Sequence, residues 1–255
     1  MLGLGTLGGG NHFIEAYNDG WISIHSGSRN IGLRVAKYYQ DLAEQRIKDY
    51  NYRIFKEQLQ SIEPAQREKW IKECKIKVPQ DLCYLTGDDM EDYLCDIKIM
   101  QKFASDNRIA IWSTIIKAMG GKVLYYIKSI HNYIDTDNMI LRKGAVSAQK
   151  DELLVIPLNM RDGVFVCKGK GNSDWNCSAP HGAGRLMSRS TAKANISIDD
   201  FIDSMKDVYS TTVCESTIDE SPFAYKDMEE IAKAIEPTVE IIDRIVPIYN
   251  FKAAD

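Results

Sequence analysis

Residues 153–169, LLVIPLNMRDGVFVCKG, contain two short apolar runs separated by a turn. The first run, LLVIPLNM, and the second, GVFVCKG, are rich in branched and aromatic side chains, and turn residues bound each of them. Runs of this length and composition predict β-strands. The stretch therefore predicts that the core of the chain is built from strands, and the other segments are interpreted around that core.

Four further segments have the same texture. They are HFIEAY (12–17), GWISIH (20–25), KVLYYIKSI (122–130) and NMILRKGAV (138–146). Clusters of Gly, Ser and Asn bound them, as in GTLGGGNH and HSGSRNIG, and such clusters are typical of turns. We expect these segments to be strands of the same core.

Helical periodicity is found mainly between the strands. Apolar residues recur at helical spacing over residues 31–62, in a shorter stretch through Trp70 after Pro64, and over residues 90–119, which end at Gly120-Gly121. Helices are also predicted within 197–209 and 225–235. The pattern predicts an α+β fold, a single domain over residues 1–255 with a strand-rich core and a helical insertion at about 31–119.

Composition limits the class of protein. With 255 residues, 44% of them hydrophobic, the chain can bury a sizeable core. Its net charge of −4 gives no overall basic signature, so any nucleic-acid contact must come from a local patch. The sequence contains no run of about 20 apolar residues, so no membrane span is predicted. The opening MLGLGTLGGG does not resemble a signal peptide. The six scattered cysteines are typical of reduced thiols, so we expect a cytoplasmic protein.

The four histidines share one kind of setting. Each is predicted at a strand end or turn beside Gly, Ser or Asn: His12, His25, His131 and His181. Any one of them alone is better interpreted as a hydrogen-bonded structural residue. All four together favour a metal site, because imidazole is the commonest protein metal ligand, but the spacing specifies no particular metal.

Two histidine-containing loops favour phosphate chemistry. HSGSR and HGAGR each join a histidine to small residues and an arginine, which can approach phosphate oxygens closely and bind them in a forked geometry. GTLGGGNH matches neither common phosphate-binding motif and is equally well a flexible turn. Asp174 and Cys177 could be a ligand pair, although a turn with a buried cysteine is the better interpretation. Basic residues in RKG (142–144) and KGK (168–170) could follow a phosphate backbone or simply be solvated.

Taken together, these motifs resemble the RtcB family of GTP-dependent RNA-splicing ligases. The resemblance extends from end to end of the chain and rests on GTLGGGNHFIE, HSGSRNIG, HNY, RKGAVSA, the PLNM turn, CSAPHGAGRLMSR and SPFAYKD. It implies an enzyme that joins RNA 2′,3′-cyclic phosphate or 3′-phosphate ends to 5′-hydroxyl ends, with GTP and two manganese ions. It also implies an RtcB-like core that lacks the N-terminal part of the family fold.

The resemblance also implies roles for individual residues. His181 matches the nucleophile that forms a histidine–GMP intermediate, and His12, His25 and His131 match the metal ligands. The implied GTP contacts are Asn11, His12, Phe13, Ile14, Glu15, His131, Asn132, Pro157, Leu158, Asn159, Met160, Val164, His181, Gly182, Ala183, Gly184 and Lys252.

The chain departs from the family pattern at several positions. PLNM stands where relatives have PGSM, Val164 stands where a hydroxyl residue is common, and Lys252 is followed by AAD. The N-terminal Asp-x-x-Cys segment that completes the family's metal site is absent, so we expect a separate segment to supply it as a partner. The alternatives are a ligation-defective nucleotide- or RNA-binding module, one half of a split enzyme, and, less well supported, a metal-dependent phosphohydrolase.

Overall fold

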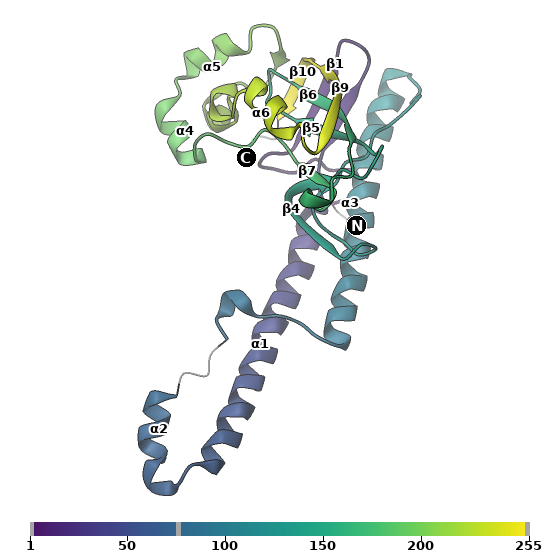
Figure 1. The fold of residues 1–255 in the computed structure, drawn as a ribbon. Helices are drawn as coiled ribbons and strands as arrows, with labels where there is room; N and C mark the ends of the chain where they lie inside the picture. Colours follow the sequence, from purple (N-terminus) through teal and green to yellow (C-terminus); the bar gives the residue numbers. More distant parts are fainter. Residues whose placement is uncertain (1–2, 75–77, 253–255) are drawn as a thin grey trace. The chain divides into compact units, whose positions relative to one another are not determined.

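A computed structural model describes residues 3–74 and 78–252 (Figure 1). The chain divides into two compact units. One is the helical unit Ser28–Phe103, and the other combines Met1–Gly27 with Ala104–Asp255 and contains every strand found among the described residues. The α+β fold class predicted from the sequence is confirmed, and the single domain with an insertion at about 31–119 stays a prediction.

The strand β6 (Val164–Gly169) is the middle strand of a three-stranded sheet in the strand-rich unit. It pairs antiparallel with β5 (Leu153–Pro157) on one side and β9 (Val239–Ile245) on the other. Successive side chains of a strand face opposite sides of the sheet. Phe165 and Cys167 accordingly pack into one apolar cluster, and Val164 and Val166 pack into another. β6 is therefore buried on both faces, which explains its continuous apolar sequence.

Helix α6 (Met228–Ile235) covers one face of this sheet. Ile231 and Ile235 are one helical turn apart and pack into the cluster that contains Phe165 and Cys167. The carboxylate of Asp227 accepts hydrogen bonds from the first backbone N–H groups of the helix, which fixes where the helix begins.

Two other sheets complete the strand-rich unit. The first has the order β2-β1-β10-β8 and the second the order β3-β4-β7. Their strands are β1 (Phe13–Tyr17), β2 (Ile22–His25), β3 (His131–Asp135), β4 (Ile140–Ser147), β7 (Ser178–Pro180), β8 (Tyr209–Ser210) and β10 (Pro247–Lys252). In the first sheet, Phe13 pairs with both His25 and Lys252, so the two ends of the chain meet there.

The helical unit contains α1 (Arg29–Ser61), α2 (Arg67–Glu73) and the first half of α3 (Asp88–Met119), with 3-10 turns at Pro64–Gln66 and Gln80–Leu82. Within this unit α1 and α3 run side by side (Figure 1), joined by a Tyr39–Asp96 hydrogen bond and an Arg46–Asp89 ion pair. The predicted long helices are confirmed within a few residues. Among the described residues, no helix is long and apolar enough to cross a membrane.

Short helices form the segment that follows the HGAGR loop (181–185). α4 (Arg189–Asn195) and α5 (Ile198–Ser204) begin at Ser188 and Ser197, whose hydroxyls accept backbone N–H bonds. The 3-10 turns are Ser173–Trp175, Glu215–Glu220 and Pro222–Ala224. Phe201, Met205 and Ile218 bury an apolar cluster together with Met160.

One predicted strand was wrong, and two strands were not predicted. Residues 122–130 form no strand: Leu124 is 95% exposed and Tyr126 is 75% exposed, and the segment has no ladder partner among the described residues. Apolar composition alone does not make a strand, because the backbone also needs a neighbour to pair with. Conversely, β9 and β10 follow the last predicted helix, in a segment for which no element was predicted, although its VEIIDRI and PIYNFK runs contain β-branched and aromatic residues.

The turn between β5 and β6 requires glycine at position 163. Gly163 has φ +80°, and a Cβ placed there would overlap the carbonyl oxygen of Ile245 on β9. We predict that Gly163→Ala lowers the free energy of unfolding by at least about 3 kcal/mol. Gly20→Ala is the matched control, because Gly20 has φ +86° but open space around it, so the expected loss is only about 1 kcal/mol. Urea denaturation measures both, and equal losses would contradict the prediction.

A buried ion pair joins β3 to β4. Arg142 donates from Nη1 to Asp135 at 2.8 Å, and its side chain is almost completely buried. Burial opposes ionisation of Asp135, but hydrogen bonds from Arg142 and Asn138 outweigh it and hold the pKa of this carboxyl at about 2.

A depressed carboxyl pKa makes stability depend on pH. At pH values above the ordinary aspartate pKa, ionised Asp135 stabilises the fold. This contribution is lost as the pH falls towards 2, where the carboxylate becomes protonated. We predict that Asp135→Asn lowers the free energy of unfolding by about 1–2 kcal/mol at pH 7, and that this difference shrinks steadily below pH 4. Asp137→Asn, in the same turn and exposed, is the control. A pH-independent difference between Asp135→Asn and the wild type would contradict this assignment.

Candidate functional site

The four histidines lie in a row across the strand-rich unit. His12 precedes β1, His25 ends β2, His131 begins β3, and His181 directly follows β7. Neighbouring ring centroids are 5.7 Å apart for His12 and His25, 5.0 Å for His25 and His131, and 4.9 Å for His131 and His181. Segments from four parts of the sequence thus place their imidazoles together.

Packing and a buried amide hold the first half of this row. The ring of Phe13 stacks on His25 at 5.2 Å. The side chain of Asn107, fully buried on α3, accepts from the backbone N–H groups of Gly5 and Thr6 and donates to Ser26 and Gly27. Because every polar atom of this amide is paired, it fixes the loop after His25 against the loop before His12.

The environment keeps the central imidazoles neutral. Burial, and then the neighbouring His131 and His12, lower the pKa of His25 to about 3. Burial, and then His181, lower the pKa of His131 to about 4. Neutral imidazole is the form that binds metal ions, since the ring nitrogen must offer a lone pair.

The geometry of His25 and His131 fits a shared metal ion. Their Nε2 atoms are 3.4 Å apart, about the separation of two nitrogen ligands on one tetrahedral ion with bonds of roughly 2.1 Å. The Nδ1 atom of His131 is buried without a hydrogen-bond partner. No group of three His, Cys, Asp or Glu side chains in the described part of the chain has the arrangement of a complete metal site. The two rings are a pair of donors, and the three-histidine assignment stays a prediction.

The loop that contains His181 is held from two sides. The backbone N–H of His181 donates to the carbonyl of Gly144 on β4, and the N–H of Ala183 donates to the carbonyl of Pro157 at the end of β5. A Cβ at Gly182 would lie 3.2 Å from that same Pro157 oxygen, so a side chain there would crowd this contact. Two loops that the sequence assigned to GTP, PLNM and HGAG, are therefore in contact.

The PLNM turn and Val164 after it direct their apolar side chains into the core. Leu158, Met160 and Val164 are each almost completely buried, in three different apolar clusters. The Asn159 carboxamide is used within the turn, where it accepts from two backbone N–H groups and donates to Asp162. The side chains of the three apolar residues are therefore used in the core.

The predicted GTP contacts on β1 are also largely buried. Glu15 accepts hydrogen bonds from the Tyr17 hydroxyl and from the Asn250 amide, both at 2.6 Å. Burial raises its pKa, and these hydrogen bonds oppose that shift. Asn11 is exposed, and Asn132, on β3, accepts a bond from the N–H of Gly144 beside the His181 loop.

Lys252 is held by a buried carboxylate. Its ammonium lies 2.8 Å from Glu220 and 5.1 Å from the centre of the Phe13 ring. Burial alone would raise the pKa of Glu220, but Lys252, Tyr225 and Arg189 together lower it. The Tyr225 hydroxyl donates to the same carboxylate at 2.6 Å, and burial raises the pKa of this tyrosine.

Basic residues of the HGAGRLMSR loop complete this cluster. Arg185 and Arg189 both approach Glu220, and Arg189 and Lys193 both pair with Asp219. A pocket of about 130 Å³ is lined by Arg189, Lys193 and the two carboxylates together with Gly10 of the GGGNH loop. Site prediction from the sequence missed Asp219, Glu220 and Lys193. The SPFAYKD motif that follows Glu220 was the available signal, although it gave no reason to expect buried carboxylates before it.

The site defines a general class. A row of histidines, with its two central rings held neutral, beside glycine turns and clustered cations is suited to binding phosphate groups and metal ions. A family model described as "tRNA-splicing ligase RtcB" matches residues 1–253, so the chain belongs to the RtcB family.

Curated relatives agree with this assignment. The chain is 34% identical to the "RNA-splicing ligase RtcB" of Escherichia coli, over 94% of this chain and 58% of that protein. It is 28% identical to the "tRNA-splicing ligase RtcB" of Aeropyrum pernix, over 90% of this chain and 55% of that protein. The chain thus spans less than two thirds of the length of these relatives.

The histidine row makes a metal-binding prediction. Imidazole nitrogens favour zinc or nickel over manganese, so we expect the chain to bind Zn²⁺ or Ni²⁺ more tightly than Mn²⁺. His25→Ala and His131→Ala should each weaken Zn²⁺ binding at least tenfold, measured by isothermal titration calorimetry. His181→Ala is the matched control, with less than about a threefold change expected. Equal losses in all three variants would contradict the division of roles along the row.

Proposed function

We propose that this chain carries the catalytic half of an RNA ligase that uses GTP. The ligase joins RNA ends bearing a 2′,3′-cyclic phosphate or 3′-phosphate to 5′-hydroxyl ends, in the cytoplasm. The main support for this proposal is the position of His181. It lies at the end of the histidine row, on a glycine turn that is hydrogen-bonded to the PLNM turn. Family membership supports the same reaction, because its named relatives are RNA-splicing and tRNA-splicing ligases.

In this proposal His181 is the nucleophile. A ring nitrogen of its neutral imidazole attacks the α-phosphorus of GTP, so that a P–N bond forms and the bond to pyrophosphate breaks. GMP then passes to the RNA 3′-phosphate, which frees the imidazole. The 5′-hydroxyl attacks the activated phosphate, GMP leaves, and a phosphodiester bond remains. Splitting the reaction in this way replaces one difficult displacement with easier ones.

The surrounding residues have supporting roles. The backbone N–H of His181 donates to the carbonyl of Gly144, and this bond positions the residue, while the side-chain-free Gly144 leaves space next to its ring. No heavy atom lies within 4 Å of a Cβ position at Gly184, which leaves open space beside the nucleophile. Lys252 and the arginines around Glu220 provide positive charge for nucleotide phosphates and RNA.

Manganese is the metal that we propose for His12, His25 and His131. Bound there, it would neutralise phosphate charge during group transfer. Because His25 and His131 supply neutral donors only, we further propose that a separate segment carrying Asp-x-x-Cys adds the anionic ligands that two manganese ions need.

The test is covalent labelling by GTP. Purified chain is incubated with α-³²P-GTP and Mn²⁺, alone and after co-expression with an Asp-x-x-Cys segment, and then denatured and counted. We predict that label attaches to the wild-type chain when the segment is present and that ligation of a 3′-phosphate/5′-hydroxyl RNA pair follows. His181→Ala should lose all covalent label while its non-covalent GTP affinity changes less than about threefold.

The outcomes separate the competing functions. Label that persists in His181→Ala would show that His181 is not the nucleophile. GTP binding without label in any arm would instead indicate a ligation-defective nucleotide-binding module. A P–N bond is labile in acid and stable in alkali, so the stability of the label identifies the attacking atom independently of the variants.

A further inference from the structure

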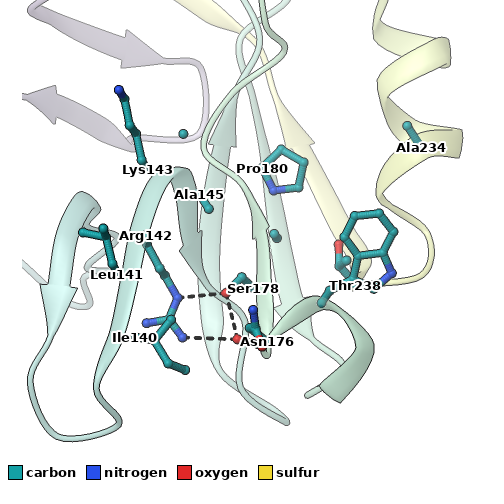
Figure 2. A pocket seen from close by; sticks show the side chains of 13 residues that line it. Ile140, Leu141, Arg142, Lys143, Ala145, Asn176, Ser178, Pro180, Ala234 and Thr238 are labelled. Atoms are coloured by element: carbon teal, nitrogen blue, oxygen red, sulfur yellow. Dashed lines mark hydrogen bonds between the residues drawn. The ribbon is translucent and has the colours of Figure 1, made fainter. Parts of the chain in front are cut away.

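A second pocket, of about 340 Å³, lies beside the His181 loop (Figure 2). It is bounded by β4, by the turn and strand over residues 175–180, and by Ala234 and Thr238 at the end of α6. This volume is within the range of small-molecule sites and is large enough for a nucleobase. None of the residues assigned above to GTP or metal lines it.

Internal hydrogen bonds satisfy the polar groups of one wall. Figure 2 shows the guanidinium of Arg142 directed at Ser178 and Asn176: Nε donates to the Ser178 hydroxyl, and Nη2 reaches the Asn176 carbonyl. The charge of Arg142 is already neutralised by Asp135. The wall is therefore fixed in place, and its polar groups are already hydrogen-bonded or paired within the protein. Such a wall favours a planar, weakly polar ligand over a charged one.

An exposed aromatic ring lies at this pocket. Trp175 is 58% exposed, although it belongs to a turn that several hydrogen bonds immobilise. Asn172 accepts from the N–H groups of Asp174, Trp175 and Cys177, and its amide donates to the Pro237 carbonyl. These bonds fix the turn that places Trp175 at the pocket, where its side chain stays largely exposed.

The pocket is continuous with the His181 loop. Pro180, which lines the pocket, directly precedes His181, and Gly144, which also lines it, accepts the His181 N–H bond. Lys143 lies between Arg142 and Gly144 and is exposed, so it adds positive charge at this edge. A strand of RNA whose end reaches His181 would pass this pocket.

The geometry points to an RNA-binding subsite: the pocket takes one unpaired nucleobase close to the RNA end, and Trp175 stacks on it. This inference rests on the proposed function for its substrate class, and it adds a binding group that the reaction itself does not require. Stacking on an aromatic ring is tolerant of base identity, so the subsite would hold RNA ends of different sequence.

The experiment measures RNA binding without chemistry. A fluorescent single-stranded RNA with a 3′-phosphate is titrated with the chain in the absence of GTP, and the dissociation constant is read from anisotropy. Trp175→Ala should weaken binding roughly 5- to 100-fold, the cost of losing one stacked base. Trp175→Phe should recover most of the affinity. Trp112→Ala, an exposed tryptophan outside the pocket, is the matched control and should leave binding unchanged.

A second series makes the result independent of folding defects. RNAs with one abasic nucleotide at successive positions from the 3′ end are bound to the wild type and to Trp175→Ala. One abasic position should weaken binding to the wild type about as much as Trp175→Ala does, and should have no further effect in that variant. Weakening at every position to the same small extent, or undiminished weakening in Trp175→Ala, would overturn the subsite.

Failure of the subsite and failure of the proposed function give different results. RNA binding that is insensitive to Trp175 and to every abasic position overturns the subsite and leaves RNA ligation standing. No RNA binding by the wild-type chain overturns both. Covalent labelling of His181 by GTP reports on the nucleophile in either case.

Discussion

Burial of β6 on both faces is the constraint on which the rest of the strand-rich unit depends. Phe165 and Cys167 pack beneath α6, while Val164 and Val166 pack on the opposite side with Tyr17 and Ile245. A slip of one residue would exchange the two sets, and their volumes differ too much for both clusters to refill. Gly163 adds a second restraint, because only a residue without a side chain fits against Ile245 at the start of the strand. The PLNM turn is fixed as a consequence, and the His181 loop docks on it through Pro157.

The site is therefore made of long-range contacts. His12, His25, His131 and His181 come from segments up to 169 residues apart, as their numbers in the sequence show, and no two of them share a strand. Burial lowers the pKa values of His25 and His131. The packing that brings the histidines together therefore also keeps these two rings neutral. Structure and chemistry are coupled here, since looser packing would both separate the rings and permit their protonation.

Local charge at the site differs from the charge of the whole chain. The chain has a net charge of −4, yet Arg185, Arg189, Lys193 and Lys252 gather around only two carboxylates, those of Asp219 and Glu220. The carboxylates are buried and the arginines are partly exposed, so positive charge faces outward. An anionic substrate can thus be bound by a protein that is acidic overall. The net charge had already indicated that any nucleic-acid contact must come from a local basic patch of this kind. The shared use of Glu220 by Lys252 and Tyr225 also links the end of the chain to the loop that contains Arg185.

Periodicity and motif determined much of this from the sequence alone. The α+β class, the long helices and the strands around residues 153–169 followed from patterns that local side-chain chemistry imposes. Family membership followed from the resemblance of the motifs to the RtcB family. The tertiary structure decided what depends on a partner distant in sequence. Residues 122–130 have strand composition but no neighbour to pair with, whereas β9 and β10 gain one from β6 and β1. Likewise, the sequence could mark His25 and Lys252 as candidates, but only the fold places His25 against His131 and Lys252 on the buried carboxylate of Glu220, because burial and distance are properties of the packed chain.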